Sequence, residues 1–311
     1  MRTRIKELEA RYLNPLTDFG FHKIFGTESN KDLLIDFLNQ IIREEGLITE
    51  IEYLNPEQWG NLRSDRKAVF DIFCTTEKGE YFIVEMQKAK QLFFRDRSIY
   101  YASLPIQRQA QKGIWNFRLN AVYFVAILDF ILFDEFKEDE EQVVEQVQLM
   151  RERTKTPYSN KLKFAFVELP KFKRAEEELE THFDKWLFIL KNLPKLKARP
   201  ETVKGKIFDK VFELADIEQL TKKDMGKYKK SVLDYYDVQD AMICAREEGR
   251  EEGREEGREE GREEGREEGR EEGKVDIIQK CIQMNVPIEV IIRLTGFSRE
   301  QISQYSVHST V

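Results

Sequence analysis

Apolar residues at helical spacing mark the beginning of the chain. Thr17 or Asp18 can cap a short helix over residues 19–25, because either side chain can accept a hydrogen bond from a backbone N–H at a helix start. Ser29 or Asn30 can begin a second helix, and Gly46 is suited to end it. The apolar positions of this second helix recur every three or four residues: Leu33, Leu34, Phe37, Leu38, Ile41 and Ile42.

Strand patterns come next. Residues 51–54, 68–75 and 81–87 are rich in β-branched and aromatic side chains, and the turn Glu77-Lys78-Gly79 predicts a hairpin between the last two. Residues 119–128 are almost continuously apolar, as is typical of a strand buried on both faces, and residues 163–169 form another strand. A helix is expected over about residues 93–112. Because strands and helices alternate, the pattern predicts an α/β domain over residues 1–175.

The rest of the chain has helical patterns. Residues 176–245 carry two apolar stripes, formed by Phe183, Trp186, Leu187 and Leu190, and by Ile207, Val211, Phe212 and Leu214. Residues 246–273 repeat Arg-Glu-Glu-Gly seven times without any apolar stripe. Each glycine costs about 1 kcal/mol in a helix, more than the roughly 0.2–0.5 kcal/mol that a Glu–Arg pair returns. We therefore expect a solvated, marginally stable helical spacer that carries no chemistry.

Three short helices are expected in residues 274–311, at 275–284, 287–294 and 298–305. This tail can be a docking or oligomerisation element, or a helix-turn-helix reader of DNA. The first interpretation is favoured, and both stay open.

Composition and cysteine usage narrow the protein class. The chain has 311 residues and 41% hydrophobic content, enough for a sizeable core. Cys74, Cys244 and Cys281 lie far apart, which argues against a zinc site or disulfides and is typical of a reducing cytoplasm. Since no run approaches about 20 apolar residues, we expect a cytoplasmic protein without membrane partners.

The net charge of −7 comes entirely from the repeat, which has seven arginines and fourteen glutamates. The remaining residues are neutral as a whole but contain a basic strip with Asp96 as its one acid: Lys88, Lys90, Arg95, Arg97, Arg108, Lys112 and Arg118. Such a strip is either a solvated helix face or a surface for phosphate. Its position directly after an acidic hairpin favours the second interpretation.

The hairpin register brings two acids together. If Glu77–Gly79 is the loop, the numbers of paired residues add to 156, so Asp71 lies opposite Glu85. Asp71, Glu85 and Gln87 then share one face, because side chains alternate along a strand. The other face should press on helices through Phe70, Ile72, Cys74, Phe82, Val84 and Met86.

Directly opposed residues have Cβ atoms about 4.5–5.5 Å apart, so the two carboxylates repel each other unless a cation lies between them. Mg²⁺ prefers such oxygen ligands and activates water in phosphodiester hydrolysis, and Gln87 is placed to orient that water. The alternative is that both acids simply face solvent.

These residues resemble those of a known nuclease superfamily. The strand around Asp71, the hairpin and the segment Ile83-Val84-Glu85-Met86-Gln87 are similar to the PD-(D/E)XK pattern. Residues 14–26, the segment from Arg97 to Tyr101, residues 121–129 and the Gly-Arg-Glu repeat resemble, more narrowly, the Rpn family of recombination-promoting nucleases and putative transposases.

The resemblance implies a restriction-endonuclease-like core, a mixed sheet flanked by helices. It also implies cleavage of double-stranded DNA with Mg²⁺ or Mn²⁺, in recombination, transposition or defence. Asp71 and Glu85 would be catalytic metal ligands, with Asp18 either a further ligand or only a helix cap. The superfamily usually has lysine at the position of Gln87, and glutamine supplies hydrogen bonds but no charge.

Candidate DNA contacts follow from the basic strip and from the resemblance: Lys90, Arg95, Arg97, Tyr101 and Arg108, with Tyr100 and Gln107 as further possibilities. A different functional class stays open, a catalytically weak interaction protein. Such a protein would form homo-oligomers through the repeat and the tail.

Overall fold

The computed structural model describes residues 7, 9–42, 47–54, 70–135 and 142–306. The chain forms two compact units, Met1–Met242 and Ile243–Val311.

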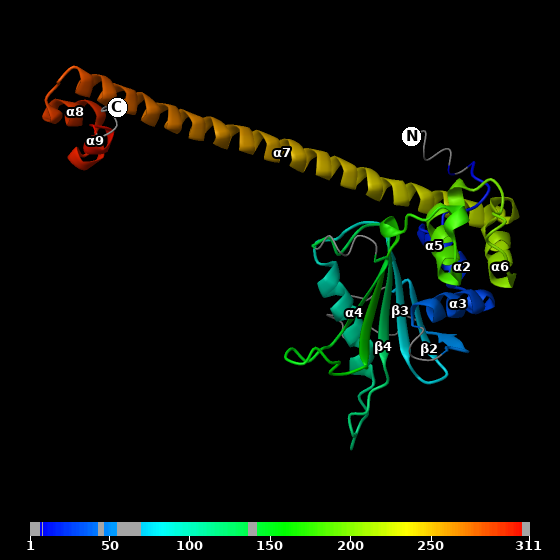
Figure 1. Ribbon diagram of the computed structural model, residues 1–311. Helices are drawn as coiled ribbons and strands as arrows, with labels where there is room; N and C mark the ends of the chain where they lie inside the picture. Colours follow the sequence, from blue (N-terminus) through cyan, green and yellow to red (C-terminus); the bar gives the residue numbers. More distant parts are fainter. Residues whose placement is uncertain (1–6, 8, 43–46, 55–69, 136–141, 307–311) are drawn as a thin grey trace. The chain divides into compact units, whose positions relative to one another are not determined.

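A mixed β-sheet lies at the centre of the first unit (Figure 1). In the described ranges it has six strands in the order β1-β2-β3-β4-β6-β5. Neighbours β3–β4 and β4–β6 run parallel, and the other pairs are antiparallel. The strands are β1 (Ile51–Tyr53), β2 (Ile72–Thr76), β3 (Tyr81–Gln87), β4 (Val122–Leu128), β5 (Val144–Gln148) and β6 (Leu162–Glu168).

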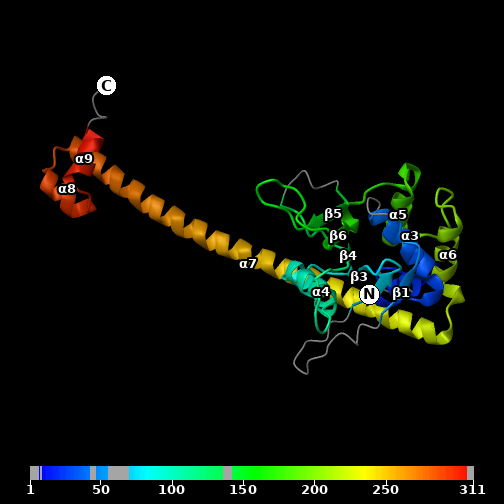
Figure 2. The same ribbon diagram turned by 90° about the horizontal axis from the view of Figure 1, so that it is seen from below.

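Helices cover both faces of this sheet, which confirms the predicted fold class. Helix α4 (Phe94–Arg108) lies on one side, as Figures 1 and 2 show from two directions. The other side carries α2 (Asp18–Phe25), α3 (Lys31–Ile41), α5 (His182–Asn192) and α6 (Lys206–Ala215). Five 3-10 turns are also described: η1 (Glu28–Asn30), η5 (Leu169–Lys171), η6 (Glu176–Glu178), η7 (Leu193–Lys195) and η8 (Ile217–Gln219).

The alternation of side chains divides the buried residues into two clusters. The cluster beneath α4 includes Phe73, Ile83, Phe94, Phe124 and Phe166. The cluster on the opposite face is larger and joins the sheet to α3, α5 and α6 through Phe37, Trp186 and Phe208, among others. Every residue of β4 is buried, as the continuous apolar run predicts.

The hairpin has the predicted register. Ile72 pairs with Val84 and Thr75 with Tyr81, and Gly79 adopts the left-handed φ of +76° that the tight turn requires. However, β2 begins only at Ile72, and Asp71 lies in a bend. Phe70 consequently packs under α4 with Phe73 and Tyr101, and its expected place on the opposite face was wrong.

The structure selects one of the two predicted N-caps of α2 and shortens α4. Thr17 is the N-cap of α2, with its Oγ1 accepting from Gly20 N at 3.1 Å, so Asp18 lies inside the first turn. Helix α4 is shorter than predicted and ends at Arg108. Gly46, the expected end of α3, lies outside the described residues.

The edge strand β5 has no counterpart among the strands predicted from the sequence. Its residues Val-Glu-Gln-Val-Gln are half-buried or exposed, and among the strands described it pairs only with β6. A polar edge strand gives little hydrophobic signal because one of its edges is left unpaired.

Helix α7 (Lys222–Gln283) begins in the first unit, where Tyr228 is fully buried and its hydroxyl accepts from Asn14 N at 2.9 Å. The repeat is helical and exposed throughout, as expected. The prediction of a separate helix over residues 275–284 was wrong, because α7 continues through to Gln283. No proline interrupts the sequence between Lys222 and Pro287.

The second unit ends with α8 (Ile288–Thr295) and α9 (Arg299–Ser306), joined at Gly296, whose φ is +78°. Its buried core consists of Ile278, Ile291 and Ile302 among the residues described. None of the helices in the described part of the chain has the length and apolar character needed to cross a membrane.

Candidate metal and nucleic-acid site

Glu85 is a buried acid near the carboxyl end of β3. Its position on the strand directs the side chain to the α4 side of the sheet, where the residue is only 2% exposed. Its Oε2 accepts a hydrogen bond from Gln87 Nε2 at 2.8 Å. Its Oε1 is buried and has no hydrogen-bond partner in the part of the chain that the structure describes. Burying a carboxylate oxygen in this way costs folding free energy unless a hydrogen-bond donor or a cation interacts with it.

The side chain of Asp71 extends the hydrogen bonding between β2 and β3 beyond the first residue of β2. Its Oδ2 accepts from Met86 N at 2.7 Å. In the observed register this N–H would face the carbonyl of Phe70 if β2 continued, because hydrogen-bonded pairs alternate in an antiparallel ladder. The carboxylate therefore replaces a strand carbonyl, and this explains the bend that directs Phe70 under α4.

The two acids influence each other electrostatically. Burial raises the pKa of Glu85 to about 8, and the charge of Asp71 adds to the increase. Burial also raises the pKa of Asp71 to about 6, although that residue keeps an exposed surface. Two negative charges are therefore unfavourable at Asp71 and Glu85, and a cation bound between the carboxylates would stabilise them.

Arg97 approaches the same acids from α4. Its Nη2 lies 3.6 Å from Glu85 Oε2, and its Nη1 donates to Gln91 Oε1 at 2.6 Å. The guanidinium lies over the rings of Phe94 and Tyr101, while its Nε is buried and, within the described ranges, has no hydrogen-bond partner. Arg97, predicted as a DNA contact, therefore lies in the acidic site itself.

Asp18 and Lys88 form an ion pair beside this site. Lys88 Nζ lies 2.7 Å from Asp18 Oδ1, and the lysine side chain is largely buried. Asp18 is close enough to raise the pKa of Asp71, whereas Lys88 lowers it. Within the described ranges, no group of three or more His, Cys, Asp or Glu side chains is arranged to hold a metal ion. Asp71 and Glu85 therefore form a pair of candidate ligands, and Asp18 is engaged by a lysine.

The predicted DNA contacts lie on α4 and on the loop before it. Lys90 pairs with Asp134 at 3.1 Å, so it does not fold back to Glu85. Arg95 pairs with Glu135 at 2.5 Å, and Tyr101 packs edge-on against Phe70. Arg108 lies at the last turn of α4.

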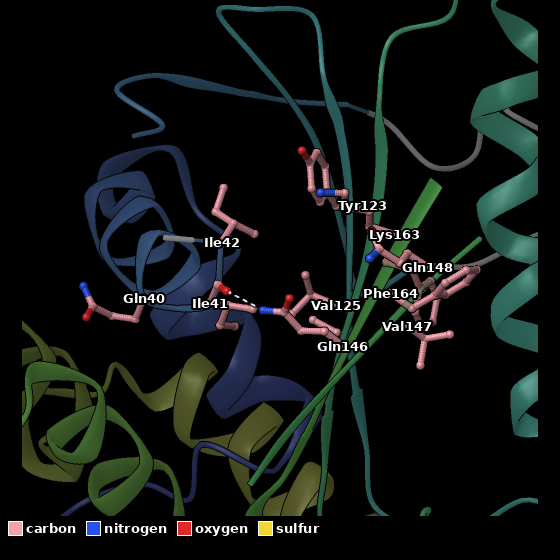
Figure 3. A pocket seen from close by; sticks show the side chains of 12 residues that line it. Gln40, Ile41, Ile42, Tyr123, Val125, Gln146, Val147, Gln148, Lys163 and Phe164 are labelled. Atoms are coloured by element: carbon pink, nitrogen blue, oxygen red, sulfur yellow. Dashed lines mark hydrogen bonds between the residues drawn. The ribbon is translucent and has the colours of Figure 1, made fainter. Parts of the chain in front are cut away.

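A separate cavity of about 270 Å³ lies where the end of α3 meets β4, β5 and β6 (Figure 3). Among the described residues its polar lining consists of Gln40, Tyr123, Gln146, Gln148 and Lys163, none of which is a carboxylate. Mg²⁺ prefers carboxylate oxygens, so the acidic pair is the stronger candidate for chemistry.

Two further buried acids were not predicted from the sequence. Asp129 follows β4 and accepts from Tyr235 Oη of α7 at 2.6 Å, and burial raises its pKa. Glu168 ends β6 and is fully buried, with Lys171 Nζ 2.6 Å from its Oε2. Both stand at the carboxyl end of a strand after a long apolar run, and that was the signal that could have found them.

Comparison with known proteins found one match among family models. The family described as PD-(D/E)XK nuclease family transposase matches residues 15–245. The comparisons with curated proteins and with solved structures found no match. The matched range includes the acidic pair, Gln87 and Arg97, and it stops before the repeat.

Proposed function

Since the chain belongs to the PD-(D/E)XK nuclease family transposases, we propose that it is a metal-dependent DNA endonuclease with Asp71 and Glu85 as its metal ligands. One observation carries the proposal: Glu85 Oε1 is buried without a hydrogen-bond partner among the described residues, beside a second acid of raised pKa. A divalent cation would satisfy that oxygen and neutralise both charges.

The donor set fits Mg²⁺ or Mn²⁺, because it consists of hard carboxylate oxygens. When bound, such an ion lowers the pKa of a water ligand and neutralises charge that develops on the phosphate. Asp18 can join as a third ligand only if it leaves Lys88, at 2.7 Å. Its place in the metal site is part of this proposal.

Most members of the superfamily have lysine at the position of Gln87. In this chain Gln87 and Arg97 together would supply the hydrogen bond and the positive charge of that lysine. The Gln87 amide is fixed by its hydrogen bond to Glu85, and its oxygen can accept a hydrogen bond from the attacking water. Arg97 contributes the positive charge that glutamine lacks, and its guanidinium lies next to Glu85, where it can stabilise a nearby anionic oxygen. Water oxygen bonds to phosphorus, one P–O ester bond breaks, and the departing oxygen takes up a proton.

The substrate in this proposal is double-stranded DNA. Lys90, Arg95 and Tyr101 lie close to Arg97 in the sequence, and Arg108 lies in the last turn of the same helix. Cationic side chains next to a phosphodiester-cleaving site are suited to bind the DNA backbone. A role on mobile DNA, in recombination or defence, accords with the family's description as transposases.

Supercoiled plasmid tests the activity directly. Wild-type protein should nick it in Mg²⁺ or Mn²⁺ but not in EDTA, and Asp71→Ala and Glu85→Ala should abolish nicking. Nicking that survives both substitutions would exclude these ligands. Absence of nicking by the wild type with every divalent metal would favour the interaction protein instead.

A second proposed role concerns the unit Ile243–Val311. Its small isoleucine core is accompanied by exposed apolar side chains at Ile277, Met284, Val290 and Leu294. A core of this size contributes little stability, and burial against a second copy of the chain would add to it. We further propose that the protein acts in the cytoplasm, since Cys74, Cys244 and Cys281 lie far apart in the sequence and do not suggest disulfides.

A further inference from the structure

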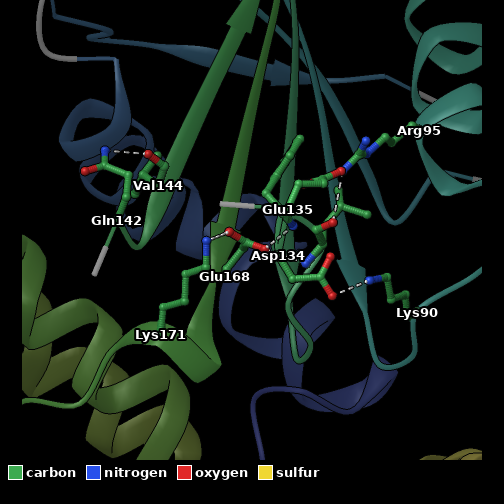
Figure 4. A network of polar contacts seen from close by, with 10 residues as sticks. Lys90, Arg95, Asp134, Glu135, Gln142, Val144, Glu168 and Lys171 are labelled. Carbon is green, nitrogen blue, oxygen red and sulfur yellow. Dashed lines mark hydrogen bonds and ion pairs between the residues drawn. The ribbon is translucent and has the colours of Figure 1, made fainter. Parts of the chain in front are cut away.

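A short acidic segment lies against the cations at the start of α4. Asp134 Oδ2 is 3.1 Å from Lys90 Nζ, and Glu135 Oε1 is 2.5 Å from Arg95 Nη2 (Figure 4). All four side chains remain between 45% and 62% exposed to solvent. The two cations are therefore at the surface and accessible, but each is already paired with a carboxylate.

This segment is held in place by more than its two ion pairs. Arg95 Nη2 also donates to Leu132 O at 3.1 Å, and its guanidinium lies 4.6 Å from the centre of the Phe133 ring. The N–H groups of Leu132 and Phe133 both donate to Glu168 Oε1, at 2.5 and 3.0 Å. The backbone before Asp134 is thus fixed from two sides.

Glu168 anchors this backbone from inside the protein. It is fully buried, and Lys171 beside it is 6% exposed. Figure 4 shows this pair next to the segment that carries Asp134 and Glu135. Burying an ion pair is costly and is tolerated when both charges are satisfied. Here the buried carboxylate fixes the position of two surface acids.

A cleft of about 630 Å³ separates the acidic segment from the loop before α4. Leu92 and Phe93 line it and are 89% and 67% exposed. Gln91 also lines it and accepts from Arg97, the residue that touches Glu85. The cleft is therefore adjacent to the acidic pair.

We propose that Asp134 and Glu135 act as an acidic gate: their carboxylates pair with Lys90 and Arg95 and must be displaced when two DNA phosphates bind these cations. The inference rests on the proposed nuclease function. Arginine binds carboxylates and phosphates with the same planar array of donors, so one anion can replace the other. Exposed ion pairs contribute little free energy, so DNA can displace them. Binding of the freed cations to DNA phosphates releases counterions, which favours the complex. The gate thus lowers affinity for DNA without blocking the site.

Binding of a short fluorescent duplex to the full-length protein in EDTA tests the gate, because no cleavage occurs there. Asp134→Asn/Glu135→Gln should tighten binding by about 2- to 30-fold, the range expected when two exposed pairs no longer compete. The control Glu152→Gln/Glu177→Gln changes two exposed acids and the net charge equally, and it should have a smaller effect. Lys90→Gln/Arg95→Gln should weaken binding and flatten the slope of log affinity against log salt by about 0.9 for each phosphate that is no longer neutralised.

The combined fourfold variant is decisive. Once Lys90 and Arg95 are replaced, removal of the acids should give no gain beyond the charge control. The gate is disproved if the gain persists without these cations, or if it only equals that of the control. In either case wild-type nicking of plasmid would leave the nuclease proposal intact. If no variant binds or nicks DNA under any condition, both proposals fail.

Discussion

At the scale of single residues, the site combines two acids that are held differently. Glu85 is enclosed under α4 with one oxygen unpartnered, whereas Asp71 is fixed by the N–H of Met86. Burial raises the pKa of both acids, and the charge of Asp71 raises that of Glu85 further, so a bound proton or a bound cation relieves the same unfavourable charge. This exchange makes metal binding and stability depend on pH.

Without metal, the free energy of unfolding should fall as pH rises from about 5 to 8. The pKa of Asp71 is about 6 and that of Glu85 about 8, above the ordinary values of 3.8 and 4.5. The folded state therefore binds more protons than the unfolded state across this window, and stability decreases with pH. Urea unfolding in EDTA should show a loss of roughly 2–4 kcal/mol.

Glu85→Gln is the variant that isolates this effect, because it keeps the side-chain shape and removes the charge. Its stability should depend less on pH between 6 and 8, and Mg²⁺ should no longer stabilise it at pH 8. Glu52→Gln, on the exposed side of β1, serves as the control. Identical pH profiles for wild type and Glu85→Gln would contradict the assignment of the buried charge.

Arg97 should matter for the chemical step. Arg97→Gln removes the charge nearest to Glu85 and should reduce plasmid nicking about 10²-fold, the range seen when a transition-state donor is removed. Arg97→Lys should recover only part of the rate, because lysine lacks the planar donor array. Arg151→Gln, an exposed control, should leave nicking unchanged. Full activity of Arg97→Gln would remove Arg97 from the mechanism.

The sequence predicts the acids but not the partner of Glu85. Strand alternation and the Glu77–Gly79 turn are local, so they fix the register that brings Asp71 toward Glu85. The contact from Arg97 depends on how α4 is rotated against the sheet, and no local pattern encodes that rotation. For the same reason the ion pairs of Lys90 and Arg95 could not be predicted.

At the scale of elements, the order of strands and helices follows the hydrophobic pattern closely where segments are buried. Strands β3, β4 and β6 could be predicted from their apolar sequences, because both faces of each strand are buried against helices. The polar edge strand β5 gave no such signal. The repeat gives a helix that continues beyond it to Gln283, although glycine recurs at every fourth position.

The glycines of the repeat should be the weak points of α7. A Cβ added at Gly257 or Gly261 would meet no atom within 4 Å, so alanine fits there without strain. Gly257→Ala/Gly261→Ala should strengthen the helix by about 1 kcal/mol per site, visible as slower amide hydrogen exchange around residues 250–265. Unchanged exchange would show that the repeat's stability does not depend on its glycines.

Gly79→Ala provides the opposite case. Gly79 has a φ of +76°, and an added Cβ would lie 2.9 Å from Asn120 Nδ2. This substitution should lower the melting temperature of the first unit, because alanine is strained in that conformation. An unchanged melting temperature would show that the turn relaxes without cost.

At the scale of the whole molecule, chemistry and assembly are assigned to different units. The acidic pair, Arg97 and the acidic gate all belong to the unit Met1–Met242. The small isoleucine core belongs to Ile243–Val311. Activity and association should therefore be separable by deletion.

Deletion of residues 246–311 should preserve metal binding and change the oligomeric state. Light scattering after size-exclusion chromatography should show a larger mass for the full-length protein than its own chain mass, and a monomer for the deletion. Equal oligomeric states would contradict association through the C-terminal unit. Binding of duplex DNA by the isolated residues 274–311 would support the helix-turn-helix interpretation instead.

Asp71 and Glu85 must together hold a divalent cation if the proposed chemistry is correct. Isothermal titration calorimetry of Mn²⁺ into the full-length protein at pH 8 measures this binding without any substrate. We predict saturable binding for the wild type and for Glu52→Gln, with release of protons from the acidic pair. Asp71→Asn and Glu85→Gln should no longer bind Mn²⁺ while remaining folded. Equal Mn²⁺ affinity in Glu85→Gln and wild type would contradict the assignment of this metal site.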